Sequence, residues 1–401
     1  MKKLLAVLLI VISVFMLTDK LPAQAAAKKT VRVTTQKELN KALKNSKVGT
    51  VILRTDSYDP FIISSKKAKK KSIIIDCPNS VIENKAKFKA ITLENAKKYT
   101  ENVSGNTIYS YNYFDDNNCS FVVAANKSVK KLVMYYPPLI DSMFYIVQKG
   151  ASIKELTIEN QGNKSTFDKK TNTVTLNTYD FEDSDYDVTY TFTLDKDGRV
   201  LKHTMMGKFW NDTFEYTYDE SGNYTQIVRS NPDNSYCNYT YRFEFVPNTT
   251  LVSAFYNLSD DFCGNTDYYY DKDNVLVEKI VYSGLSAYRS SYAYDKNGRL
   301  EYEDCIIYEI VNGDELVEDG MNSRSYKYDK KGNRIEELTY TQWGNSFKTT
   351  YKYDKNGNKV LIINESDGDI DEMKLEYDEY GNNEGMYTKD ENGNWQKLQA
   401  G

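Results

Sequence analysis

A short motif repeats through the second half of this chain and constrains its fold more than any other feature. Its clearest copy is Tyr351–Asn358, with the sequence YKYDKNGN. Tyr351 and Tyr353 are two residues apart, so on a strand they point to the same face. Asp354 suits the first position of a tight turn, and Gly357 suits a position that needs a positive φ. The motif therefore predicts a strand, a tight turn and a second strand, which form one end of a β-hairpin.

Copies of the motif recur at nearly equal distances along the chain. The turn positions of eight copies are Asp195, Asp219, Val246, Asp271, Asp295, Asp329, Asp354 and Asp378. Successive turns are 24, 27, 25, 24, 34, 25 and 24 residues apart, and a second turn follows most of them within the same period. Spacing this regular indicates a repeat architecture with two strands and two turns in each unit. We therefore predict an antiparallel meander of about eight units and about 15 strands over residues 173–398.

This region resembles the YD-repeat (Rhs-type) family of bacterial secreted and surface proteins. The resemblance is carried by Tyr-x-Tyr-Asp-x-x-Gly units, most clearly at residues 292–300, 326–334 and 351–359. It implies carbohydrate binding and contact with cell surfaces. Large family members wind many repeats into a hollow shell around a toxin or cargo, but with about eight units and no toxin domain after them we expect no closed cargo shell here. The choline-binding type of cell-wall repeat is a rival resemblance, although its aromatic hairpins are shorter and richer in Trp than this chain, which has three Trp residues.

The first part of the chain has a different pattern. Residues 35–45 predict a short amphipathic helix with Thr34 or Thr35 as its N-cap and Leu39, Ala42 and Leu43 as its apolar stripe. Short runs of β-branched and apolar residues follow, separated by polar turns. A capping helix before short strands resembles the start of a right-handed parallel β-helix, as in pectate-lyase-like proteins, over residues 31–160. The expected fold is thus all-β: a β-solenoid-like domain, a linker at residues 161–172, and the repeat meander.

The first 25 residues predict a secretory signal. Lys2 and Lys3 precede an apolar run at residues 4–17, and Ala23–Ala25 fits a cleavage site with small residues. The apolar run has 14 residues, fewer than a membrane-spanning helix needs. We therefore expect an exported bacterial protein, secreted or attached to the cell wall without a covalent link, with no membrane span after cleavage.

Charge is divided unevenly between the two halves. Residues 28–160 contain 23 Lys and Arg but only 12 Asp and Glu. Residues 161–401 contain 26 Lys and Arg but 44 Asp and Glu. The densest basic run consists of Lys66, Lys67, Lys69, Lys70 and Lys71. It predicts a patch for an anionic polymer such as teichoic acid or an acidic glycan, and the alternative is a solvated loop between strands. Nucleic acid is not expected as a partner of an exported chain with a net charge of -5.

Aromatic side chains are the main candidates for ligand contact, because they can stack on sugar rings. Trp210 and Trp343 fall at second turns, outside the repeated Tyr positions, and are the preferred candidates. Tyr351 and Tyr353 represent the repeated Tyr pairs. The alternative for these pairs is cross-strand packing, with each pair contributing roughly 0.2–1 kcal/mol to the sheet.

Few residues in this chain suit catalysis or metal binding. A single histidine, His203, leaves no His cluster and is expected to be structural. The acidic run at residues 367–372 lacks a glycine at its sixth position and the distal Glu spacing of an EF-hand calcium loop, so a hairpin turn is the better interpretation. We expect no metal and no cofactor. Of five cysteines, Cys237 and Cys263 are about one repeat apart and could face each other, a pairing that the sequence leaves open.

These features predict a secreted surface protein without enzymatic activity, which contacts a glycan, a cell-wall polymer or another surface protein through a β-repeat scaffold. One alternative is a structural spacer or matrix protein that binds no small ligand. A less favoured alternative is a carbohydrate-active enzyme of the β-helix type. That enzyme would need paired carboxylates facing one groove, drawn from Asp56, Asp59, Asp76 and Glu83.

Overall fold

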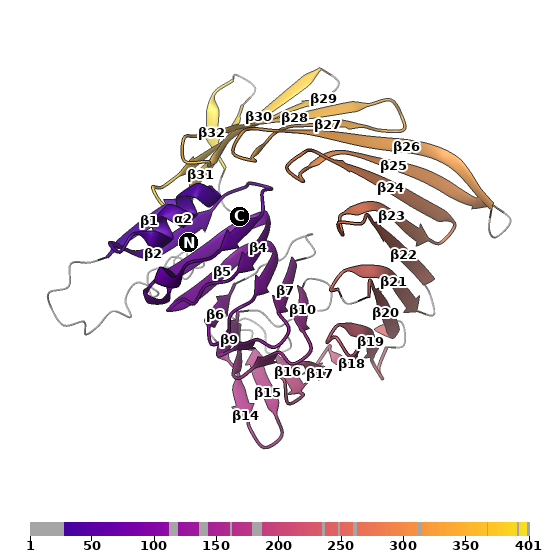
Figure 1. Cartoon of the computed structure of the whole chain (residues 1–401). Helices are drawn as coiled ribbons and strands as arrows, with labels where there is room; N and C mark the ends of the chain where they lie inside the picture. The colour runs from indigo at the N-terminus through magenta and orange to yellow at the C-terminus, as the bar shows by residue number, and fades with distance from the viewer. Residues whose placement is uncertain are drawn as a thin grey trace.

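The structure is a computed structural model in which an all-β chain forms a parallel β-helix followed by a long antiparallel sheet (Figure 1). It describes residues 28–111, 119–135, 143–160, 163–178, 187–234, 237–247, 249–259, 263–311, 315–366, 368–390 and 393–398. The predicted signal at residues 1–25 lies outside the described residues. The all-β fold class predicted from the sequence is confirmed, with its parallel front part and its antiparallel meander.

The β-helix winds its strands into parallel ladders on three faces. The first face contains β1 (Lys29–Val33), β2 (Val48–Arg54), the first halves of β4 (Ser72–Asn84) and β5 (Ala90–Glu101), β6 (Thr107–Ser110), β9 (Lys131–Met134) and β12 (Leu156–Asn160). The second contains β3 (Phe61–Ile63), the second halves of β4 and β5, β7 (Cys119–Val123) and β10 (Met143–Val147). The third is the short pair β8 (Ser128–Val129) and β11 (Ser152–Ile153).

Apolar side chains stack in register inside the β-helix. One such column consists of Val51, Ile73, Ile91, Ile108, Leu132 and Leu156, each paired with the next across parallel strands. Every member is at most 4% exposed. Burying each of these side chains contributes about 1.5–3 kcal/mol, so the column holds consecutive coils together.

The predicted capping helix is confirmed as α2 (Gln36–Lys44). The Thr35 side chain accepts a hydrogen bond from the Glu38 amide, and the Glu38 carboxylate accepts one from the Thr34 amide at 2.9 Å. This reciprocal arrangement resembles a capping box, except that the carboxylate bonds to the amide just before the N-cap. Leu39, Ala42 and Leu43 are buried, as the apolar stripe predicted, and cover the end of the first coil.

Among the described residues, the antiparallel sheet has 19 strands in chain order. They are β14 (Thr166–Asp168), β15 (Thr173–Thr178), β16 (Val188–Leu194), β17 (Val200–Gly207), β18 (Asn211–Tyr218), β19 (Tyr224–Ser230), β20 (Tyr239–Phe245), β21 (Val252–Ser259), β22 (Cys263–Tyr270), β23 (Leu276–Ser283), β24 (Ser286–Tyr294), β25 (Leu300–Val311), β26 (Glu315–Tyr328), β27 (Arg334–Tyr340), β28 (Ser346–Tyr353), β29 (Lys359–Ser366), β30 (Asp369–Tyr377), β31 (Asn383–Lys389) and β32 (Trp395–Lys397).

The sheet is longer than the expected 15 strands because it extends beyond the eight repeats at both ends. β14 and β15 precede the first repeat turn, and β32 follows a further hydrogen bond of the same kind, from the Gly393 amide to the Asp390 carbonyl at 2.9 Å. The stretch expected to be a linker, residues 161–172, holds β14 and the short β13 (Asn163–Lys164), which pairs with β12.

The repeated motif forms the same turn along one edge of the sheet, and we call these the Asp turns. In the copy that begins at Asp354, the carboxylate accepts hydrogen bonds from the amides of Asn356 at 2.8 Å and Asn358 at 2.9 Å. Gly357 takes a φ of 80°, a conformation that side chains with a Cβ rarely adopt. In the fourth copy, Asn274 replaces the glycine at a φ of 62°.

The Asp turns contact the β-helix at both of its ends. Near the last coils, the Ile153 amide donates to the Asp197 carbonyl at 3.0 Å. Near the first coils, the Tyr58 amide donates to the Gly332 carbonyl at 3.1 Å, and Arg54 donates to the Asn382 side chain at 2.8 Å. The sheet therefore leaves the β-helix at one end, arches around it and meets it again at the other (Figure 1). The sequence did not predict this return contact.

Candidate functional site

A small pocket opens at the edge of the sheet opposite the Asp turns. It lies between the tip of the β17–β18 hairpin and the connection from β19 to β20, and it has a volume of about 240 Å³. We call it the Trp210 pocket. Its lining residues are Gly207, Lys208, Phe209, Trp210, Asn211, Asp212, Arg229, Asn231, Asp233, Asn234 and Cys237.

The polar side of the pocket is built around Asp212, which is only 1% exposed. Arg229 binds both carboxylate oxygens, through Nε at 3.0 Å and Nη2 at 3.1 Å. Asn231 adds a third hydrogen bond at 3.0 Å. Burial alone lowers the pKa of Arg229, but the hydrogen bonds and charge of Asp212 outweigh this and raise it. The three side chains therefore form a cluster fixed by three hydrogen bonds, two of them between Arg229 and Asp212.

Residues 231–234, which follow β19, are also held by hydrogen bonds. The Asn231 side-chain oxygen accepts hydrogen bonds from the amides of Asp233 at 2.9 Å and Asn234 at 3.0 Å, which closes a local turn. Asn211, at the start of β18, donates to the Asp233 carboxylate at 2.7 Å. This last bond ties the loop to the neighbouring hairpin, so the two segments that frame the pocket are joined.

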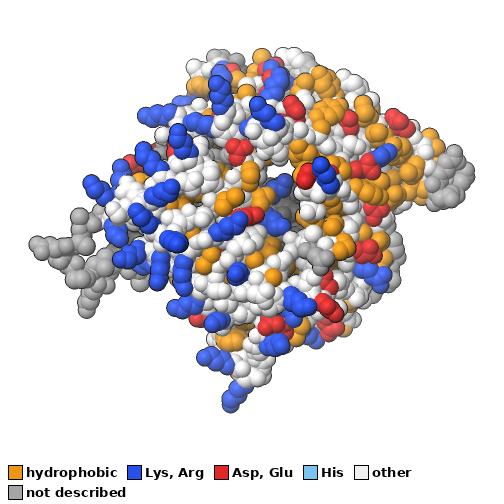
Figure 2. Space-filling model, viewed as in Figure 1, with side chains coloured by type: hydrophobic (Ala, Val, Ile, Leu, Met, Phe, Trp, Pro, Cys, Tyr) orange, Lys and Arg blue, Asp and Glu red, His pale blue; other side chains and the backbone are white. Residues whose placement is uncertain are grey.

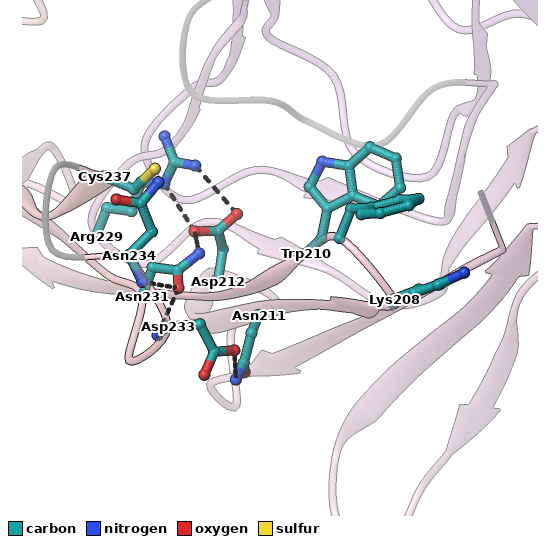
Figure 3. Close-up of a pocket in the computed structure, with 11 residues that line it drawn as sticks. Lys208, Trp210, Asn211, Asp212, Arg229, Asn231, Asp233, Asn234 and Cys237 are labelled. Carbon is teal, nitrogen blue, oxygen red and sulfur yellow. Dashed lines mark hydrogen bonds and ion pairs between the residues drawn. The ribbon is translucent and has the colours of Figure 1, made fainter. Parts of the chain in front are cut away.

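Trp210 supplies the apolar side of the pocket. Its carbonyl accepts a hydrogen bond from the Gly207 amide at 2.8 Å, which fixes the hairpin tip. A Cβ at Gly207 would lie 3.5 Å from the indole and only 2.6 Å from the Asp187 carbonyl, so glycine is required for this close approach. Figure 3 shows the indole on one side of the space and the cluster of Asp212, Arg229 and Asn231 on the other.

The sequence predicted Trp210 as a ligand contact but not its polar neighbours. Asp212 and Arg229 meet because β18 pairs with β19 in a register that places Phe214 opposite Arg229. The Arg229 guanidinium then lies 5.6 Å from the centre of the Phe214 ring and 5.5 Å from that of Tyr239. The Asn-Pro-Asp-Asn turn at residues 231–234 was visible in the sequence only as a second turn of the repeat.

The other predicted aromatic contacts lie elsewhere on the sheet. Trp343 sits at the β27–β28 tip and is 78% exposed. A nearby depression of about 330 Å³ is lined by Leu338, Ser346, Lys348, Glu365, Ser366, Gly368, Asp369 and Ile370, without Trp343. Tyr351 lies under Lys359, with the ammonium 5.0 Å from the ring centre. Tyr353 donates its hydroxyl hydrogen bond to the Arg334 carbonyl at 2.8 Å, a contact that favours a packing role.

The predicted basic run folds as a short 3-10 helix, η1 (Lys66–Lys70). Lys66, Lys67, Lys69 and Lys70 are exposed. Lys71 is only 3% exposed, and its ammonium donates to the carbonyls of Asn45 and Val48, both at 2.6 Å. The exposed part of the predicted patch therefore consists of the four lysines of η1.

The four carboxylates of the enzyme alternative each lie next to a different basic side chain. Their partners are Lys359 for Asp56 at 3.4 Å, Arg299 for Asp59 at 3.9 Å, Arg54 for Asp76 at 2.8 Å and Lys85 for Glu83 at 2.7 Å. Within the described ranges, no three His, Cys, Asp or Glu side chains come together as metal ligands. No helix in the same ranges is long and apolar enough to cross a membrane.

The sequence left open a pairing of two cysteines, and the structure describes the thiol of one of them, Cys237. Cys237 lines the Trp210 pocket as a free thiol. Cys77 and Cys305 are also free, and Cys77 is buried in the β-helix.

Comparisons with known proteins find likeness in structure only. No protein-family model matches the sequence, and no curated protein matches it. Among solved structures, a Photorhabdus luminescens Tc holotoxin pore is 10% identical, with a TM-score of 0.30 over 58% of this chain and 16% of that one. A TcdB2–TccC3 complex is 10% identical, with a TM-score of 0.28 over 57% of this chain and 16% of that one. A porin-like protein from Bacteroides vulgatus is 15% identical, with a TM-score of 0.22 over 48% of this chain and 92% of that one. The chain thus spans about a sixth of the Tc proteins that it matches.

Proposed function

We propose that this chain is an extracellular bacterial binding protein whose Trp210 pocket holds one sugar residue of a neutral glycan. The observation that carries the proposal is the indole of Trp210 facing a rigid polar cluster across a small pocket. Carbon-bound hydrogens of a sugar ring can pack on an indole, while its hydroxyl groups bond to fixed amide, carboxylate and guanidinium groups. The extracellular location follows from the signal predicted at residues 1–25.

The size and bonding of the pocket support this class of ligand. Its volume of 240 Å³ is below the roughly 300–1,000 Å³ of sites for drug-sized ligands, so it suits a single ring. Both oxygens of Asp212 are engaged by Arg229 and Asn231. A carboxylate held in this way favours binding over proton transfer, which is why we propose a binding role.

Trp210→Ala tests the proposal. Neutral oligosaccharides would be screened on a glycan array with the mature protein, and the best ligand would be measured by titration calorimetry. We expect the variant to bind at least about tenfold more weakly, because it loses an aromatic contact of about 1.5 kcal/mol. Binding by the unmodified protein should also resist high salt, since the ligand carries no charge.

Trp343→Ala is the matched control, because this indole is exposed and lines neither pocket. It should bind like the unmodified protein. Equal binding by both variants would contradict the proposed site. If the unmodified protein bound no glycan at all, the structural spacer would become the better interpretation.

A further inference from the structure

The coils of the β-helix bring lysines from distant parts of the sequence to one corner. The Lys89 amide donates to the Lys71 carbonyl at 2.8 Å, and the Lys130 amide donates to the Asn106 carbonyl at 2.8 Å. The strand registers after this corner continue the stacking, with Ser72 beside Ala90 and Leu132 beside Leu156. One position of the coil is therefore occupied in turn by Lys71, Lys89, Asn106, Lys130 and Lys154.

The positions just before this one are basic as well in the first coils. Lys67 and Lys69 come four and two residues before Lys71, just as Lys85 and Lys87 come four and two residues before Lys89. In the segment of residues 85–89, lysines alternate with the buried Ala86 and Phe88, so the lysines face outward. We name the exposed set the lysine ladder: Lys67, Lys69, Lys85, Lys87, Lys89, Lys130 and Lys154. The sequence alone pointed only to the run at residues 66–71.

Among the described residues, most of the lysine ladder has no acidic partner. Lys85 pairs with Glu83 at 2.7 Å. No described carboxylate forms an ion pair with Lys67, Lys69, Lys87 or Lys89. Neighbouring coils lie about 4.8 Å apart, so these ammonium groups repel one another unless an external anion lies between them.

The rest of the molecule directs an anion to this corner. Figure 2 shows Lys and Arg side chains gathered over the β-helix, whereas the meander side carries more acidic and apolar side chains. Residues 161–401 contain 44 Asp and Glu against 26 Lys and Arg. The two parts thus present opposite charge, which repels a polyanion from the sheet and attracts it to the β-helix.

We propose that the lysine ladder binds an extended anionic polymer with a phosphate or carboxylate group on each repeat. A regular polymer can engage several lysines on successive coils at once, and this multivalency compensates for the weakness of each exposed contact. This site is separate from the Trp210 pocket and does not depend on the proposed sugar binding.

The test is a triple substitution, Lys69→Gln, Lys87→Gln and Lys89→Gln, in the mature full-length protein. The probes are poly(glycerol phosphate) and polygalacturonate, one for each source of charge, with neutral dextran as the blank. We expect the variant to bind one of the two polyanions at least about tenfold more weakly at low salt. The slope of log affinity against log salt should also fall by up to about three, one for each contact removed.

Two control variants distinguish binding at the lysine ladder from attraction by the overall charge of the protein. The first control carries Lys196→Gln, Lys272→Gln and Lys330→Gln, at exposed lysines of the Asp turns. It removes the same charge from the sheet and should leave binding unchanged. The second control carries Lys69→Arg, Lys87→Arg and Lys89→Arg, which keep the charge and should retain binding. An equal loss in the sheet variant, or unchanged affinity in the ladder variant, would overturn the proposal. So would tighter ladder-dependent binding to phosphatidylglycerol vesicles than to either polymer. Trp210→Ala should bind the polyanion normally, which keeps this test independent of the sugar site.

Discussion

His203 is a single buried side chain that makes the stability of the sheet depend on pH. It lies in β17 with the rings of Phe192 and Phe214 stacked on either side, at centre-to-centre distances of 4.6 and 4.8 Å. It is 0% exposed, and no described residue bonds to either ring nitrogen. Burial lowers its pKa to about 4, and the opposing effect of Asp212 is smaller. The folded protein therefore holds this imidazole neutral.

We predict a loss of stability between pH 6.5 and 4 that is specific to His203. In the unfolded chain the pKa is near 6.5, so below that pH the unfolded state binds a proton that the folded state does not. The contribution of neutral His203 to the free energy of unfolding is complete above pH 6.5. It is lost as the pH falls toward 4, by at most roughly 3 kcal/mol. Urea unfolding at pH 7.5, 5.5 and 4.5 measures it. His203→Phe keeps an aromatic ring in the stack and should show a smaller loss, and an identical pH dependence in both proteins would contradict the prediction.

At the scale of the β-strand, the second Tyr of several repeats joins its unit to the preceding one. The hydroxyl groups of Tyr218, Tyr294, Tyr328 and Tyr353 donate to the carbonyls of Val200, Leu276, Leu300 and Arg334, at 2.7–2.8 Å. Each acceptor lies five residues after the turn position of the preceding unit. The repeated Tyr therefore has a structural reason that does not involve a ligand.

Tyr353→Phe should destabilise the sheet by about 1 kcal/mol, because it removes one such hydrogen bond and little volume. Tyr340→Phe is the control, since Tyr340 is 50% exposed at the other edge of the sheet. The midpoint of urea unfolding should fall in the first variant and remain unchanged in the second. Equal midpoints would mean that water replaces the lost hydrogen bond at no cost.

The sequence predicted the elements whose bonds are local. The Asp turns depend on hydrogen bonds from Asp354 to residues two and four positions later, and the α2 cap spans only Thr34 to Glu38. Residue type and spacing were enough in both cases. The recurring short apolar runs predicted that apolar side chains stack inside the β-helix. The uneven lengths of its coils concealed which residues stack on one another.

The sequence could not predict contacts that depend on the register or on long-range closure. Asp212 meets Arg229 through the pairing of β18 with β19, and nothing in either segment alone marks the pair. Lys71 looks like its exposed neighbours in sequence, yet its position at the end of the first coils turns its ammonium onto backbone carbonyls. Arg54 and Asn382 are 328 residues apart, so their contact exists only in the complete ring.

At the scale of the whole molecule, the β-helix and the sheet form a closed ring that the last Asp turns complete. Arg54 is the centre of one closing contact: it pairs with Asp76 at 2.8 Å and Glu94 at 2.6 Å in the β-helix, and with Asn382 in the sheet. Burial lowers the pKa of Arg54, but the two carboxylates outweigh this and raise it. The second closing contact is the Asp turn at Gly332, which lies against Ser57 and Asp59.

Gly332→Ala should open this ring, whereas Gly298→Ala should not. Both glycines have a positive φ, of 85° and 79°, so each substitution costs about 1 kcal/mol from the backbone alone. A Cβ at Gly332 would also collide with Ser57, whereas one at Gly298 meets nothing within 4 Å. This overpacking should add about 1–3 kcal/mol in the first variant. Urea unfolding measures the difference, and small-angle scattering should show a larger radius of gyration only for Gly332→Ala. Equal stability and equal radii would mean that the sheet keeps its arch without this contact to the β-helix.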